Sequence, residues 1–195
     1  MIRAKVTMPK NKLLVNKDSS AFYRRAGDYM VSSTKAKINA GIKPGNAPLT
    51  RKIKKNNLPL RDSGGLLSSF HSKIEADGVS VSTSHPAARI NQEGGTITPK
   101  RAKRLAVPAG DKTRTLMRRF GATPRLCIDR MKAAGWKIWV VKGTIMAQET
   151  KRSKAFPLFF LKAKIKIPKR KFLFISKQDQ AIIRAMFMNE MIRRP

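Results

Sequence analysis

The strongest constraint on the fold is a pair of alternating runs in residues 70–85, joined at Asp77-Gly78. An Asp-Gly pair between such runs favours a two-residue hairpin turn, because both turn positions accept positive φ. We therefore predict a register in which Ile74 faces Val81. The apolar face of this hairpin comprises Phe70, Ile74, Ala76, Val79 and Val81. Serines and charged residues form the opposite face, which we expect to be exposed.

Helices are expected near both ends of the chain. Residues 21–42 place apolar side chains such as Phe22 and Ala26 at helical spacing. A last helix begins after Ser176, which can cap it, and Asp179 completes a box-like start. The sequence therefore predicts a helix before the first hairpin and another at the C-terminal end.

Further strand signals lie in the second half of the chain. A second hairpin is expected around the turn Lys142-Gly143, and residues 161–167 alternate apolar side chains with lysines. Residues 46–65 are rich in Pro, Asn and Lys and are expected to form a loop. The expected fold class is α+β, an antiparallel sheet of hairpins flanked by an N-terminal and a C-terminal helix, with basic extended arms and loops.

The expected organisation is a basic N-terminal arm at 1–20 and a single domain at 21–195. Within the domain, Pro86 opens a short helix that the glycine pair at 94–95 ends. A long basic loop is expected at about 99–125, because Lys and Arg are dense there and no sustained period is visible.

Charge restricts the possible partners. The chain has 43 Lys and Arg residues against 11 acidic residues, a formal net charge of +32. Such a charge favours an anionic partner, which could be nucleic acid, an acidic protein or an anionic membrane, although a solvated basic surface without a partner is also possible. The longest apolar stretch, at 155–161, is far too short to span a bilayer of about 20 helical residues, so no membrane role is expected.

The residues give little support for catalysis or metal binding. The only histidines, His71 and His85, are expected on opposite faces of the hairpin, which argues against a shared metal site. The single cysteine, Cys127, excludes an internal disulfide and is expected in a core. No phosphate-binding loop or catalytic triad motif is present. We therefore expect no enzyme activity, no catalytic residues and no cofactor.

Four stretches in order resemble the phage virion morphogenesis family, the tail-completion proteins of Mu-like and related tailed phages. They are "APLT" (47–50), "LRDSGGLLSSF" (60–70), "VSVSTSHPAARINQEGGTI" (79–97) and "IPKRKFLFISKQD" (167–179). The chain departs from the family pattern at Ser63, where Thr is usual, at Ala87, where Tyr is common, at Asn91, where His is common, and at Phe174, where Gly is usual.

The resemblance implies a structural virion protein of the head–tail junction, made in the host cytoplasm. It also implies a sixfold or twelvefold ring of identical subunits that contacts head connector and tail proteins, with genomic DNA as a further partner in the lumen. The family-motif positions are Asp62, Gly64, Gly65, Gln92, Gly94, Gly95, Arg170 and Phe172. The simplest role for Arg170 and Phe172 is to fix the approach to the last helix.

The loop that follows the glycine pair carries the best candidates for contact with an acidic partner protein or DNA. These candidates are Lys100, Arg101, Lys103 and Arg104. The alternative function, favoured by charge alone, is a cellular RNA-binding protein of ribosomal type. A plain solvated loop also remains open for this segment.

Overall fold

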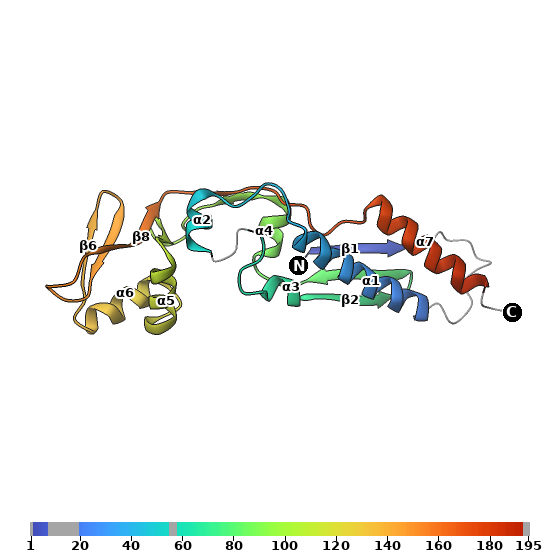
Figure 1. The fold of residues 1–195 in the computed structure, drawn as a ribbon, viewed down its shortest axis with the longest axis horizontal. Helices are drawn as coiled ribbons and strands as arrows, with labels where there is room; N and C mark the ends of the chain where they lie inside the picture. The colour runs from blue at the N-terminus through green and yellow to red at the C-terminus, as the bar shows by residue number, and fades with distance from the viewer. Residues whose placement is uncertain (1, 8–19, 55–57, 193–195) are drawn as a thin grey trace. The chain divides into compact units, whose positions relative to one another are not determined.

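The computed structural model describes residues 2–7, 20–54 and 58–192. The chain forms two compact units (Figure 1). Unit 1 comprises residues 1–45, 58–95 and 168–195, and unit 2 comprises residues 46–57 and 96–167. The sequence predicted one domain over 21–195, whereas the contacts divide these residues between two units. The physical cause of this division is that the buried apolar side chains gather in two clusters that share no residue.

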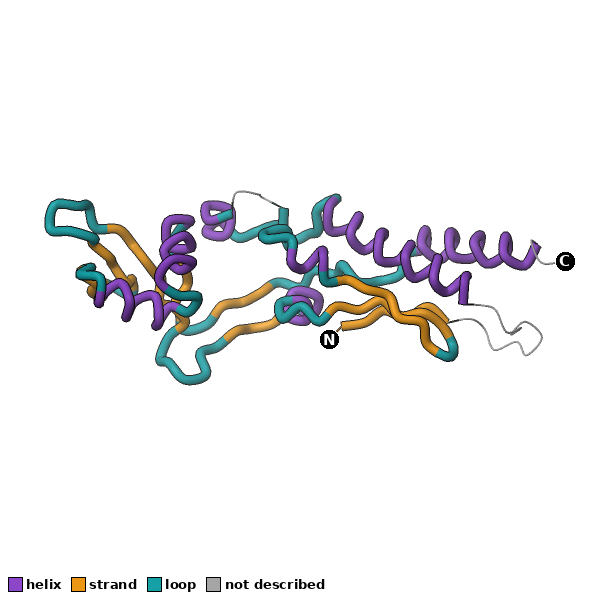
Figure 2. Tube along the Cα trace, turned by 90° about the horizontal axis from the view of Figure 1, so that it is seen from below, coloured by secondary structure: helices purple, strands orange, loops and turns teal. Residues whose placement is uncertain are grey.

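Unit 1 is built on a three-stranded antiparallel sheet with the strand order β1-β3-β2. Its elements are β1 (Ile2–Thr7), α1 (Ser20–Asn39), α3 (Gly65–Ser68), β2 (Phe70–Glu75), β3 (Gly78–Thr83), α4 (Ala88–Glu93) and α7 (Lys177–Ile192). Helix α1 packs against β2 and β3, and α7 packs against α1 (Figures 1 and 2). Both predicted terminal helices are confirmed.

The first strand corrects the prediction of an N-terminal arm at 1–20. Residues 2–7 pair with β3 along their whole length, from Ile2 opposite Thr83 to Thr7 opposite Gly78. Ile2 belongs to the core of unit 1, so alternate side chains of this basic segment pack against that apolar core. The remainder of the expected arm, residues 8–19, lies outside the described residues.

The first hairpin forms with a register two residues away from the predicted one. Ile74 faces Val79, and the turn residues are Ala76 and Asp77. Gly78 is a strand residue and not a turn residue. The position requires glycine, because a Cβ atom there would lie 2.1 Å from the carbonyl oxygen of Val6 in β1. A shift of two preserves the sorting of side chains between the two faces. The predicted faces are therefore confirmed, whereas the turn position is wrong.

The polar face of this hairpin is covered in β3, contrary to the expectation that it is exposed, whereas His71 and Lys73 in β2 are exposed. β3 is the central strand, and every residue in it is buried, including Ser80 and Ser82. The Ser80 hydroxyl donates to Glu75 Oε1 at 2.9 Å, and Ser82 Oγ lies 3.1 Å from His71 Nε2. Long side chains of the flanking strands thus lie over the short serines. By contrast, Ile74 on edge strand β2 is 41% exposed.

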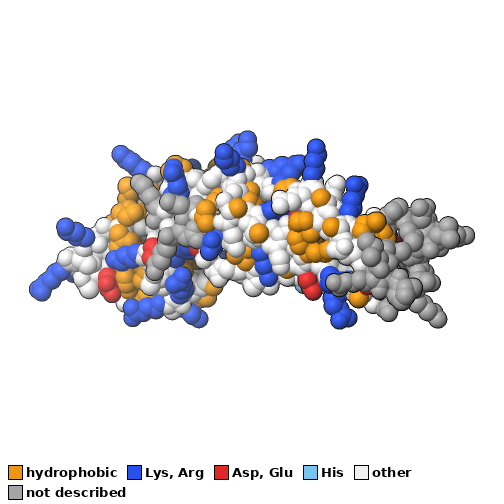
Figure 3. All heavy atoms as spheres, turned by 45° about the vertical axis from the view of Figure 1, so that its right-hand side comes forward, with side chains coloured by type: hydrophobic (Ala, Val, Ile, Leu, Met, Phe, Trp, Pro, Cys, Tyr) orange, Lys and Arg blue, Asp and Glu red, His pale blue; other side chains and the backbone are white. Residues whose placement is uncertain are grey.

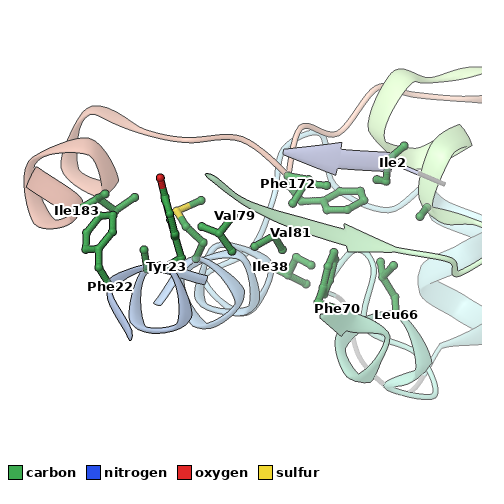
Figure 4. Close-up of a cluster of buried hydrophobic side chains, with 14 residues drawn as sticks. Ile2, Phe22, Tyr23, Ile38, Leu66, Phe70, Val79, Val81, Phe172 and Ile183 are labelled. Atoms are coloured by element: carbon green, nitrogen blue, oxygen red, sulfur yellow. The ribbon is translucent and has the colours of Figure 1, made fainter. Parts of the chain in front are cut away.

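The core of unit 1 lies between the sheet and α1 and extends to α7 (Figure 4). It includes Phe22 and Ala26, which confirms the predicted apolar stripe of the first helix. Phe70 and Phe172 meet edge to face with ring centroids 5.9 Å apart. The segment that precedes α7 is therefore anchored in the same core as the hairpin.

Unit 2 contains a four-stranded antiparallel sheet with the strand order β5-β8-β7-β6. Its elements are α2 (Pro48–Ile53), β5 (Leu105–Pro108), α5 (Asp111–Phe120), α6 (Pro124–Ala133), β6 (Lys137–Val141), β7 (Thr144–Gln148) and β8 (Phe156–Lys162). The hairpin predicted around Lys142-Gly143 is confirmed as β6 and β7. Side chains of α5, α6 and the sheet form the second core.

Two segments expected to be loops contain regular structure. The predicted loop at 46–65 contains α2, which begins at Pro48, a position where a missing N–H costs nothing. The predicted loop at 99–125 contains all of α5 and the start of α6. Helix α5 is stable because Thr113 and Leu116 are buried against the core. Because the buried Thr113 is polar, the helical spacing of buried residues in α5 is hard to recognise in the sequence.

A small two-stranded sheet pairs β4 (Gly95–Ile97) with β9 (Ile165–Ile167). The strand expected over 161–167 is therefore interrupted, with its first residues in β8 and its last in β9. The predicted α+β class, with antiparallel sheets and helices at both ends, is confirmed. Among the described residues, no helix has the length and apolar character to cross a membrane.

Candidate functional site

The residues by which the chain resembles a known family meet mainly at one place in unit 1, where the end of α4 contacts the segment before α7. Gln92 is the central side chain. Its Oε1 accepts hydrogen bonds from the backbone N–H groups of Phe172 at 3.0 Å and Leu173 at 3.1 Å. Its Nε2 donates to the Leu173 carbonyl oxygen at 3.0 Å. One amide side chain thus pairs three backbone groups of an irregular segment.

Arg170 holds the same segment to a second stretch of backbone. Its Nε donates to the Pro44 carbonyl oxygen at 2.8 Å, and one terminal nitrogen donates to the Gly45 carbonyl oxygen at 3.0 Å. The other terminal nitrogen lies 3.4 Å from Asn91 Oδ1. The residue is 7% exposed, and burial lowers the pKa of its guanidinium. These donors are engaged within the protein, so the geometry suits a structural clamp.

The glycine pair lets the two segments approach each other closely. Gly94 has φ +75, and a Cβ atom there would lie 2.8 Å from the backbone nitrogen of Lys169. Gly95 has φ +153, and its Cβ would lie 2.7 Å from Ile90 Cδ1. Both positions therefore favour glycine on conformational and steric grounds. Gln92, Gly94, Gly95, Arg170 and Phe172 form the cluster that we call the α4 junction.

The remaining motif positions lie just before α3 or at its first residue and are not part of the α4 junction. Gly64 has φ +82 and stands at the N-terminal end of α3. The hydroxyl of Ser63 accepts a hydrogen bond from the Gly65 N–H at 3.4 Å. Asp62 lies in the bend that precedes α3, and it also has an interaction partner. The geometry here is that of a tight turn leading into a helix.

The candidate contact residues of the basic loop lie in unit 2, between β4 and β5. Lys100, Arg101, Lys103 and Arg104 all occupy bends and are all exposed. The loop is thus shorter than expected, about seven residues at 98–104, and keeps its four cations accessible. Figure 3 shows Lys and Arg side chains projecting over the visible face, where Asp and Glu side chains are few.

A second exposed group of cations borders the α4 junction in unit 1. A surface depression there is lined by Ile2, Arg3, Gln92, Glu93, Lys169, Lys171 and Leu173. Three of these seven side chains are basic and one is acidic. Such a depression can receive an acidic side chain of a partner protein. Sequence reasoning missed it, because only the pairing of β1 with β3 brings Arg3 to this part of the unit.

The described residues contain no group of three or more His, Cys, Asp or Glu side chains that could hold a metal ion. His71 contacts Ser82 in the hairpin, whereas His85 lies beyond it, where Nδ1 accepts a hydrogen bond from the Ala87 N–H. Cys127 is fully buried, and burial raises the pKa of its thiol. This environment opposes formation of a reactive thiolate.

Comparison with known proteins gives one match. A sequence model of the phage virion morphogenesis family matches residues 6–124. The chain belongs to this family. No curated protein and no solved structure matches the chain significantly. Membership makes this a bacteriophage virion protein with a structural role.

The family match shows how the motif positions are supported. It spans Asp62, the turn before α3 and the glycine pair, so these resemblances lie inside the matched region. Arg170 and Phe172 lie beyond residue 124, and their assignment rests on the resemblance and on their contacts with α4. The match also ends at the start of α6, so about half of unit 2 lies outside it.

Proposed function

We propose that this phage virion morphogenesis protein is a tail-completion or neck-ring subunit that joins the head connector to the tail. The observation that carries the proposal is the family match over residues 6–124. Its location in the virion is then the head–tail junction. The α4 junction supports the proposal, because its side chains fix backbone segments and so build a rigid body for assembly.

The proposed partners are other copies of the chain, in a sixfold or twelvefold ring, and the connector and tail proteins on either side. Closed rings of identical subunits need a heterologous interface that repeats around the axis. The depression lined by Arg3, Lys169 and Lys171 is a candidate for one side of a contact. The loop with Lys100 and Arg101 is a candidate for contact with an acidic rim or with DNA in the lumen.

The test is complementation of a phage that lacks this gene. Without complementation, negative-stain microscopy of lysates should show full heads and complete tails that are not joined. The intact protein supplied from a plasmid should restore joined particles and infectivity. Joined particles in the absence of the protein would contradict the proposal, as would heads that fail to fill with DNA.

The same assay tests the basic loop. Replacing Lys100, Arg101, Lys103 and Arg104 with Gln should abolish joining, because four accessible charges of one contact are removed. A matched variant that removes four other exposed cations of unit 2, at Lys151, Arg152, Lys154 and Lys164, should still join. Equal infectivity of the two variants would show that the basic loop is not needed for joining. Thermal melting checks that both variants fold.

The purified protein separates this function from that of a ribosomal-type RNA-binding protein. A ring subunit should form symmetric oligomers of one size in the absence of nucleic acid, measured by light scattering after nuclease treatment. A monomer that becomes ordered only with RNA would favour the RNA-binding alternative.

A further inference from the structure

The positive charge is concentrated in unit 2. This unit contains 23 Lys and Arg residues and three acidic residues, whereas unit 1 contains 20 and eight. Unit 2 therefore has a net charge of +20, the difference between 23 and three, in 84 residues. Whatever ion pairs form within it, three carboxylates cannot neutralise this charge. Charge of this density favours an anionic partner for unit 2 itself.

Within unit 2, α5 and α6 form a helix–turn–helix. Each helix has ten residues, and only Gly121, Ala122 and Thr123 separate them. Gly121 has φ +153, and the Thr123 hydroxyl caps α6 by accepting from the Leu126 N–H at 3.3 Å. The helices pack against each other and run in different directions in Figure 2. A short glycine-containing turn of this length is typical of helix–turn–helix motifs.

One face of each helix packs against the core of unit 2. The opposite face of each helix is therefore exposed to solvent. Leu116, Cys127 and Met131 are buried, and the Thr113 hydroxyl donates to the Leu158 carbonyl oxygen at 2.9 Å. Residues on the opposite sides of both helices therefore point away from the sheet.

The outward faces carry mainly arginine and lysine. The exposed cations on these faces are Arg118 and Arg119 on α5 and Arg125, Arg130 and Lys132 on α6, whereas Lys112 Nζ lies 3.8 Å from the ring centroid of Phe156 in the sheet. Arg125 lies 3.9 Å from Asp129, but both side chains are largely exposed, so this pair is weak and exchangeable. Four of these five cations are arginines, whose planar guanidinium groups match phosphate oxygens in pairs.

We propose that the outward face of α5 and α6 binds duplex DNA through its phosphate backbone, without sequence preference. Helix–turn–helix motifs place one helix at the major groove while the other crosses the backbone. Duplex DNA presents one negative charge per about 1.7 Å, so several phosphates lie within reach of these cations on two helices of about 15 Å each. The inference stands apart from ring formation and applies to the purified protein.

The composition of this face favours DNA over an acidic protein. Stable protein interfaces contain a desolvated apolar or aromatic centre. On the described residues of α5 and α6, Leu126 is the one large apolar side chain that is exposed, at 40%. Protein–DNA interfaces, by contrast, are polar and strongly positive.

The experiment measures binding of the full-length protein to a fluorescent duplex of random sequence, over a range of salt concentrations. The test variant replaces Arg118, Arg119, Arg125 and Lys132 with Gln. At about 0.15 M salt its Kd should rise at least tenfold. The slope of log Kd against log salt should fall by about two to four, because each lost phosphate contact contributes about 0.9.

The matched control removes the same charge from unit 1 by replacing Arg24, Arg89, Arg184 and Lys177 with Gln. It also comprises three arginines and one lysine, all exposed on helices. Arg89 pairs with Glu93 four residues later, as Arg125 does with Asp129. The control should change Kd less than threefold. Circular dichroism should show the same helix content for both variants.

Equal losses in the two variants would overturn the proposal, because binding would then depend on total charge. Failure of the intact protein to bind the duplex would also overturn it. Tighter binding to a single strand with the same number of phosphates would show that the duplex is the wrong partner. If polyglutamate of the same charge competes as well as unlabelled duplex for the protein, the face would instead be a binding site for an acidic protein.

Discussion

Asp179 is a buried carboxylate in the first turn of α7, and it links this helix to α1. Lys37 Nζ and Ser33 Oγ each donate to it at 2.6 Å, and Tyr29 donates at 3.1 Å. Asp179 and Ser176 also cap α7 reciprocally through each other's backbone N–H. Burial by itself would raise the pKa of this carboxyl, but hydrogen bonds from Lys37, Ser33 and Ser176 lower it well below the ordinary range.

This network predicts acid sensitivity. Because the pKa of Asp179 is lower in the folded state than in the unfolded chain, its stabilisation is present above the unfolded value and is lost as the pH falls. The Asp179→Asn variant should lose about 3 kcal/mol of unfolding free energy at pH 7. Between about pH 5 and pH 2, the melting temperature should fall less for this variant than for the intact protein.

Melting curves recorded by circular dichroism across this pH range give the measurement. Asp28→Asn provides the control, because Asp28 is exposed on the same α1 helix. Its pH dependence should match that of the intact protein. Parallel pH profiles for the intact protein and Asp179→Asn would show that Asp179 does not carry the acid sensitivity.

At the scale of elements, the α4 junction joins a short helix to an irregular segment by backbone contacts. The glycine pair ends α4 and brings the chain against Lys169. The amide of Gln92 then satisfies backbone groups that no strand or helix would pair. Six residues of helix hold little stability alone, so the contacts of α4 depend on this junction.

Gly94→Ala should destabilise the protein by about 2 kcal/mol or more, because the new methyl group meets Lys169 backbone and φ is positive. Chemical denaturation followed by circular dichroism measures the change. Gly45→Ala is the matched control in the same unit, since no atom lies within 4 Å of a Cβ atom there. Its effect should stay below about 0.5 kcal/mol. Similar losses at both glycines would argue against the close approach.

At the scale of the whole molecule, two separate cores imply two cooperative units. Unit 1 is centred on residues such as Val81, and unit 2 on residues such as Leu158, which is fully buried. Each cluster draws on helices and strands of its own unit. Local stability therefore need not be uniform along the chain.

A charge placed in one core should unfold that unit selectively. Val81→Asp should abolish hydrogen-exchange protection in β2 and β3 while α6 and β7 stay protected, because a buried unpaired charge costs several kcal/mol. Leu158→Asp should give the reverse pattern. Hydrogen exchange followed by mass spectrometry resolves both. Loss of protection throughout the chain in either variant would mean that the two units unfold as one.

Features that depend on neighbours along the chain could be predicted from the amino-acid sequence. The stripe of Phe22 and Ala26 set α1, and alternation around Asp77 set the two faces of the first hairpin. Family membership was also readable from motifs in order, such as the glycine pair at 94–95. Helix α5 was missed, although Asp111 in its first turn and Arg118 in its last are favourable for the helix dipole.

Features that depend on contacts between distant segments could not be predicted from the sequence. The backbone of Val6 lies against Gly78 in β3, and the hairpin turn lies one residue earlier than predicted, at Ala76-Asp77. The pairing of β1 with β3 likewise turned a basic arm into a strand and covered Ser80 and Ser82. The division into two cores arose because apolar side chains from separate stretches of chain meet in space. Such contacts are fixed by packing and leave no periodic signal in the local sequence.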